Sequence, residues 1–188
     1  VASLASAQVV ALTTDQLRAF TSGQVRALTA EQVGGLSTAQ VVGLSTANVV
    51  ALLSDQMVAL ETRDLEALTT TNIQALLSSQ LAALGTSQIA ALSSAQVLNF
   101  STANIYALRT EQLRALETQD VAVLTSIQIQ SLRTAQLTAL DSATIWAVVN
   151  ATSCVVCKLA KLAVAKAVKS AVSKETNWAV PKASSCAD

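Results

Sequence analysis

Apolar residues recur every eight positions along residues 5–148, in 18 consecutive octads without an insertion or deletion. Residues 13–20 (TTDQLRAF) form one copy, and numbering them one to eight defines the octad positions. Position five is always Val, Leu, Ile or Met, and position eight is Leu in 15 copies. Position two is Ser or Thr in 17 copies, and position seven is Ala in 13. So short a repeat indicates a solenoid, in which each unit buries its apolar face by stacking on its neighbours.

The octad period excludes a continuous α-helix, because eight residues advance about 800° and each apolar pair would turn about 80° from the last. A β-solenoid remains an alternative, since eight is even and Gln and Thr form good ladders. Ala, Gln, Leu and Arg, however, favour helix over strand, and the chain has only five Gly. A hydroxyl at position one or two, followed by Gln, is typical of a helix N-terminus. The sequence therefore predicts an all-α solenoid of short capped helices, one per octad.

Positions five and eight lie three residues apart and share one helix face, which we expect to form the core. The small residue at position seven should let backbones approach closely. Positions three and six are mixed in character, as solvent-facing positions usually are. Residues 45–52 also match residues 101–108, an offset of 56 residues or seven octads. An odd number does not support a stack of helix pairs; it fits a superhelix with a non-integral number of octads per turn, or a duplication without geometric meaning.

Position four is polar in every octad: Gln in 12, Asn in three, Asp in two and Thr in one. Such a residue beside the core is either an exposed partner of the helix cap or part of a ladder that satisfies backbone groups at the corners. We favour the ladder, because the exposed positions of this chain vary far more. The predicted ladder residues are Gln16, Gln24, Gln32, Gln40, Asn48, Gln56, Asp64, Asn72, Gln80, Gln88, Gln96, Asn104, Gln112, Asp120, Gln128 and Gln136.

The composition changes after Val148, which divides the chain into an octad solenoid, residues 1–148, and a basic C-terminal segment, residues 149–188. All six Arg lie in the first part and all six Lys in the second, giving net charges of −4 and +4. Residues 154–173, rich in Ala, Val, Leu and Lys, predict a long helix. This segment could cap the end of the solenoid, dock on an acidic surface of a neighbouring copy, or contact an anionic membrane surface.

The three cysteines, Cys154, Cys157 and Cys186, all lie in the C-terminal segment. The C-x-x-C pair lacks the βαβ context of a redox motif, and a zinc site needs four ligands in a chain that has no His. We expect crosslinks, one disulfide plus a thiol available to another chain. Reduced cysteines buried on a helix are the alternative.

The sequence offers no constellation for catalysis. It has no His and no Gly-rich phosphate loop, and its carboxylates are scattered over variable positions, so we expect neither an enzyme nor a cofactor. The negative charge of the octads does not favour nucleic acid, whose binding depends on neutralising phosphates. No stretch reaches the roughly 18 to 20 uncharged apolar residues that a transmembrane helix needs.

The octad S/T-x-x-Q-V-x-A-L, over residues 5–148, resembles the repeat of very long secreted bacterial surface proteins, often labelled haem utilisation or adhesion proteins. The resemblance implies an extracellular or cell-surface protein with a structural or adhesive role. Its haem label finds no support here, because His is absent. We expect a structural protein that self-associates, head to tail, into an extracellular filament or matrix. A stalk or adhesive segment of a bacterial surface protein and an ice-binding protein are the alternatives.

Overall fold

The computed structural model describes residues 4–140, and each octad in this range forms one short α-helix. The all-α prediction is confirmed and the β-solenoid alternative is wrong, because no strand occurs among these residues. The helices are α1 (Ser6–Val10), α2 (Thr14–Arg18), α3 (Ser22–Arg26), α4 (Ala30–Gly34), α5 (Thr38–Val42), α6 (Thr46–Ala51), α7 (Ser54–Ala59), α8 (Thr62–Ala67), α9 (Thr70–Ala75), α10 (Ser78–Ala83), α11 (Thr86–Ala90), α12 (Ser94–Leu98), α13 (Thr102–Ala107), α14 (Thr110–Ala115), α15 (Thr118–Ala122), α16 (Ser126–Gln130) and α17 (Thr134–Ala139).

Each helix begins at position two, because the residue at position one is extended and serves as the N-cap. Thr13, for example, has φ −72° and ψ 159°, and its Oγ1 accepts a hydrogen bond from the Gln16 N–H at 3.2 Å. The helix ends at position six or seven, as where Leu52 turns to φ −58° and ψ 136°. A helix of five or six residues is about 8–9 Å long and does not hold alone in water. The fold must therefore be stabilised by packing between octads.

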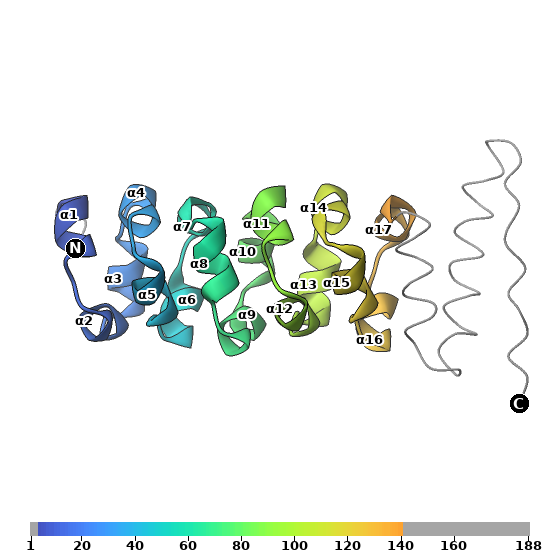
Figure 1. The fold of residues 1–188 in the computed structure, drawn as a ribbon, viewed down its shortest axis with the longest axis horizontal. Helices are drawn as coiled ribbons and strands as arrows, with labels where there is room; N and C mark the ends of the chain where they lie inside the picture. The colour runs from blue at the N-terminus through green and yellow to red at the C-terminus, as the bar shows by residue number, and fades with distance from the viewer. Residues whose placement is uncertain (1–3, 141–188) are drawn as a thin grey trace, which may run out of the picture.

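Each helix packs on the helices three octads before and after it, which arranges the chain as a coil of about three octads per turn. This geometry produces three rows of helices along the rod (Figure 1). The first row is α1, α4, α7, α10, α13 and α16; the second is α2, α5, α8, α11, α14 and α17; the third is α3, α6, α9, α12 and α15. The upper edge in Figure 1 passes from α1, α4 and α7 to α11, α14 and α17, so the rows wind slowly around the long axis.

The core is a continuous column of position-five and position-eight side chains, as predicted from their shared face. Position five is buried from Val9 to Ile129, and position eight from Leu28 to Leu140. The side chains at position three are exposed throughout the described octads, and most of those at position six are exposed as well. The burial pattern confirms the assignment of helix faces made from the octad pattern.

Two glycines lie where neighbouring coils approach too closely for a larger residue. Gly43 is at position seven, and a Cβ there would lie 2.9 Å from the Cβ of Thr14 on the preceding coil. Gly34 is at position six, where a Cβ would lie 2.8 Å from the backbone oxygen of Ala59. The small residue at position seven thus allows close approach, as expected. Gly34 departs from the expected solvent-facing role of position six, because α4 is half-buried there against α7.

Candidate functional site

The position-four amide closes the start of its own helix. The Gln80 Oε1 accepts a hydrogen bond from the Leu77 N–H at 2.9 Å, and the Gln88 Oε1 accepts one from the Gly85 N–H at 2.9 Å. Neither Leu77 nor Gly85 has a side-chain oxygen to cap the helix. The amide therefore satisfies a backbone donor even where the octad lacks a capping hydroxyl at position one. This tolerance explains why position one can vary while position four stays polar.

The same amide donates in the opposite direction, to the corner of the preceding coil. The Gln96 Nε2 donates to the carbonyl oxygens of Leu65 at 2.8 Å, Glu66 at 3.1 Å and Leu68 at 2.7 Å. These carbonyls lie at the end of a helix four octads earlier, where helical carbonyls run out of partners; only that of Leu65 also accepts a backbone hydrogen bond there, from the Leu68 N–H at 3.2 Å. One buried side chain thus caps the N-terminus of its own helix and the C-terminus of another, and so ties successive coils together.

The predicted ladder residues fall into two groups in the structure. From Gln32 to Gln136 every one of them is buried, whereas Gln16 and Gln24 are exposed, as is Gln8. These three amides belong to α1–α3, which have no earlier coil among the described residues. Cys154, Cys157, Cys186 and the predicted helix of residues 154–173 lie outside the described residues.

Among the described residues, four of the five shorter side chains at position four accept a hydrogen bond from a hydroxyl of the preceding coil; the exception, Asn48, accepts one from Ser45 in its own octad. The Thr38 Oγ1 donates to Asp64 Oδ1 at 2.7 Å, and the Ser94 Oγ donates to Asp120 Oδ1 at 2.6 Å. In both cases the donor is a position-two residue 26 positions earlier, on the helix that packs beside the acid. Thr46 and Ser78 donate to Asn72 and Asn104 in the same way, at 3.3 and 3.1 Å. These hydroxyls thus add a further hydrogen bond between neighbouring coils.

Replacing Ser94 with Ala is expected to lower the free energy of unfolding by about 1–3 kcal/mol, because it removes a partner from the buried Asp120 carboxylate. The Ser54→Ala variant is the matched control. Ser54 is an exposed position-two residue, and the side chain 26 positions later is Gln80, with which it makes no hydrogen bond in the structure. Urea denaturation followed by circular dichroism measures both changes. Equal losses in the two variants would contradict the pairing of position two with the short acids.

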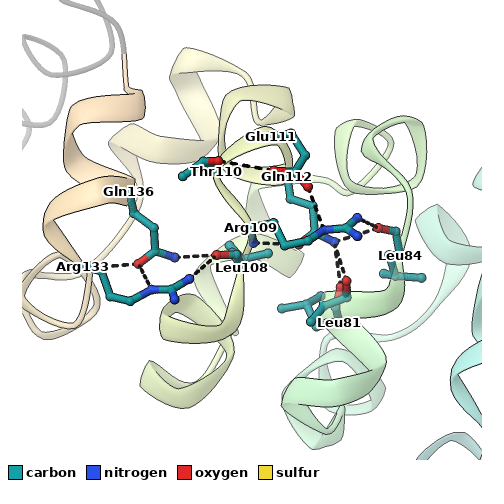
Figure 2. A network of polar contacts seen from close by, with 10 residues as sticks. Leu81, Leu84, Leu108, Arg109, Thr110, Glu111, Gln112, Arg133 and Gln136 are labelled. Carbon is teal, nitrogen blue, oxygen red and sulfur yellow. Dashed lines mark hydrogen bonds and ion pairs between the residues drawn. The ribbon is translucent and has the colours of Figure 1, made fainter.

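Two arginines at position one reinforce the corners, a role that the sequence did not indicate (Figure 2). The Arg109 Nη2 donates to the Leu84 carbonyl at 2.9 Å, and the Gln112 Nε2 donates to the same oxygen at 2.7 Å. Arg133 repeats the arrangement, donating to the Leu108 carbonyl at 3.1 Å. Position one varies too much for its arginines to stand out as ladder residues. Only the coil geometry places them over a corner.

The recurring polar side chains have a structural role. Every buried side-chain nitrogen or oxygen between residues 4 and 140 has a hydrogen-bond partner, so the repeated polar groups are engaged within the coil. Within the described helices no group of three His, Cys, Asp or Glu side chains is arranged to hold a metal ion. None of these helices is both long and apolar enough to cross a membrane. What the recurring side chains do here is join one coil to the next.

Comparison with known proteins finds a family model for the repeat. A family model described as the ALTTAQ repeat matches residues 1–38, 32–62 and 57–94, which together span residues 1–94 of the 188. Residues 11–16 read ALTTDQ, so the described motif covers a corner, a helix cap and the position-four Gln. The match supports an octad-type repeat. Neither the curated proteins nor the solved structures include a match to the chain.

Proposed function

The chain belongs to the ALTTAQ repeat family, and we propose that it serves as a structural rod that associates end to end with copies of itself into an extracellular filament or matrix. The buried polar network supports a structural role, because its amides and hydroxyls form the hydrogen bonds that join the coils. An extracellular location is supported by the resemblance of the octads to the repeats of secreted bacterial surface proteins. The proposed partner is a second copy of the chain.

The observation that carries the proposal is the contact between coils, which the first coil makes on one side only among the described residues. Gln8, Gln16 and Gln24 expose the amides that later octads use to bind the carbonyls of the preceding coil. Each of the three still bonds the start of its own helix, as the Gln24 Oε1 does with the Thr21 N–H at 2.8 Å. Among the described residues their Nε2 groups make no hydrogen bond, so they are available to a coil stacked before α1.

The apolar side chains of the first coil point to the same conclusion. Leu4, Leu12 and Phe20 occupy position eight but are only partly buried, although they pack against the core. From Leu28 onward the same position is buried by the neighbouring coil. A stacked coil would cover apolar surface and supply carbonyl acceptors at once. Another copy can offer both, because every internal coil of this chain already binds its neighbour in this way. A contact between unlike faces extends into an open filament unless its rotation closes a ring.

The C-terminal segment is proposed to reinforce the end-to-end contact. Its net charge of +4 is opposite to the −4 of the octads, and its three cysteines could crosslink neighbouring copies. Because exposed charge pairs contribute little each, the crosslinks are the stronger of the two contributions.

Sedimentation velocity at increasing concentration tests the proposal. The full chain should form polymers, and the double variant Gln16→Glu, Gln24→Glu should shorten them sharply, because each carboxylate keeps the cap but turns a donor toward carbonyls into an acceptor. Ala7→Glu with Gly23→Glu is the matched control: it adds the same two charges to the same coil at exposed position three. Removing residues 149–188 should also shorten the polymers, most clearly under non-reducing conditions. A full chain that stays monomeric at high concentration, reduced and oxidised, would overturn the proposal.

An adhesive stalk is the second candidate, and the variability of the outward positions favours it. Position three alone holds Asp15, Arg63 and Ile127, all exposed, and none of these side chains makes a hydrogen bond to another coil. Such positions could display a binding surface on a rigid rod. Ice binding is less well supported, because position-two hydroxyls such as those of Thr38 and Ser94 are engaged by position-four side chains. A thermal hysteresis measurement would test it.

A further inference from the structure

Charge is distributed unequally among the three rows of helices. Between residues 4 and 140 there are 15 charged side chains, of which ten belong to octads of the second row, three to the third and two to the first. The first row has only Glu31 and Asp55, and among the described residues it has no cation. The octads of α10, α13 and α16 carry no charged residue at all.

Exposed apolar side chains show the opposite distribution. Nine large hydrophobic side chains are exposed in the described residues, and six of them belong to the first row. These six are Val10, Leu53, Val58, Leu77, Tyr106 and Ile127. One cation of the second row reaches them, because the Arg133 guanidinium lies over the Tyr106 ring, 5.0 Å from its centroid. Ile127 is 69 % exposed and Tyr106 56 %, the largest values of the nine. Scattered apolar residues are normal on a protein surface, but this gathering on the row with the fewest charges is not.

We propose that the first row is an interface along which two copies of the chain lie side by side in antiparallel orientation. A second copy fits this row because exposed residues of the row recur at whole numbers of coils. Val10, Val58 and Tyr106 all stand at position six, two coils apart. Leu53 and Leu77, for instance, both stand at position one, on the adjacent helices α7 and α10. An anionic membrane surface is a poor match, because the row offers two acids and no cation to it.

The positions of the two acids select the antiparallel orientation. In a parallel pair in register, Glu31 would meet Glu31 and Asp55 would meet Asp55, and like charges facing each other oppose association. An antiparallel pair centred between α7 and α10 instead places Asp55 opposite Ser79 of the second copy. Glu31 on α4 then lies opposite the uncharged α13. This arrangement also brings Leu53 and Val58 of each copy against Leu77 of the other.

The lateral interface is separate from the end-to-end contact, so it can be tested in the full chain carrying Gln16→Glu and Gln24→Glu. In this background, sedimentation equilibrium should show dimers that Leu53→Glu with Leu77→Glu weakens at least about tenfold, since charges replace central apolar contacts. Gly85→Glu with Ser93→Glu is the control, at position one of the second and third rows. Glu61 and Glu117 show that Glu fits position one. Dimers equally sensitive to both pairs, or no dimers at all, would overturn the proposal.

A photo-crosslinking amino acid at Ser79, exposed at position three of α10, tests the orientation. In a mixture of isotopically light and heavy chains, crosslinks between copies should map to residues 53–60. Crosslinks to residues 77–84 would overturn the antiparallel arrangement. The same label at Ser87, exposed on α11 in the second row, should give no dominant crosslink between copies. The result does not depend on the proposed function: chains that pair laterally but never lengthen would refute the end-to-end filament alone, and chains that lengthen without pairing would refute only the lateral interface.

Discussion

The Leu84→Asp variant is expected to lose its folded structure across several neighbouring octads. Leu84 is fully buried at position eight, in the middle of the described rod. An unpaired charge buried there costs several kcal/mol, a large part of the roughly 5–15 kcal/mol that stabilises a typical domain. In a solenoid this loss falls first on the octads in contact with Leu84, because each repeat is stabilised by its neighbours. Circular dichroism at 222 nm should therefore show reduced helix content or a much lower unfolding temperature.

The Ala90→Asp variant is the matched control for Leu84→Asp. Ala90 lies at position six of α11 and is exposed, so the same new carboxylate stays in water. We expect a change within about 0.5 kcal/mol, as for most surface substitutions. Equal damage from the two variants would mean that the core and solvent faces of the octad have been assigned wrongly.

The Gln96→Leu variant is expected to lose about 2–5 kcal/mol, although Leu fills much of the same volume. The substitution leaves the Leu68 carbonyl without its side-chain donor and the Ser93 N–H without its acceptor, while the Leu65 carbonyl keeps only the Leu68 N–H. A buried group left unsatisfied costs about 1–3 kcal/mol. Urea denaturation measures the total. Hydrogen exchange should show the loss of protection concentrated between α8 and α12.

Gln24→Leu separates the corner bonds from the cap. Gln24 is exposed, and its side-chain bonds are to Thr21 within its own octad. Losing them should cost only about 0.5–2 kcal/mol, in the range of a helix cap. A loss as large as that of Gln96→Leu would show that the bonds between coils contribute little.

The helical octad and its buried face could be predicted because each rests on information local to eight residues. Thr13 and Gln16 indicate the start of a helix, and Leu17 and Phe20 indicate which face of that helix is buried. The number of octads per turn could not be predicted this way. It is set by the corner between one helix and the next, and almost identical corners could close coils of different sizes. The sequence does hold one sign of the coil: the two most strongly charged octads, which begin at Glu61 and Arg109, are separated by a multiple of 24 residues.

The position-four side chains show the same limit. Their polarity beside the core marked them as structural, yet the carbonyls that they bind lie 28 to 31 residues earlier, a spacing that only the coil provides. For the same reason Ser94 could not be connected with Asp120 from the sequence, nor Arg109 with Leu84. Contacts of this kind leave no pattern within one octad.

Because one coil contains about three octads, the effect of adding or losing octads depends on whether their number is a multiple of three. Gain or loss of three octads would lengthen or shorten the rod and leave each later helix in its row. Gain or loss of one octad would move every later helix to a neighbouring row. The row rich in charged residues and the row poor in them would then be interrupted at that point. The related octads at residues 45–52 and 101–108 already show such a shift. Seven octads apart, they form α6 in the third row and α13 in the first.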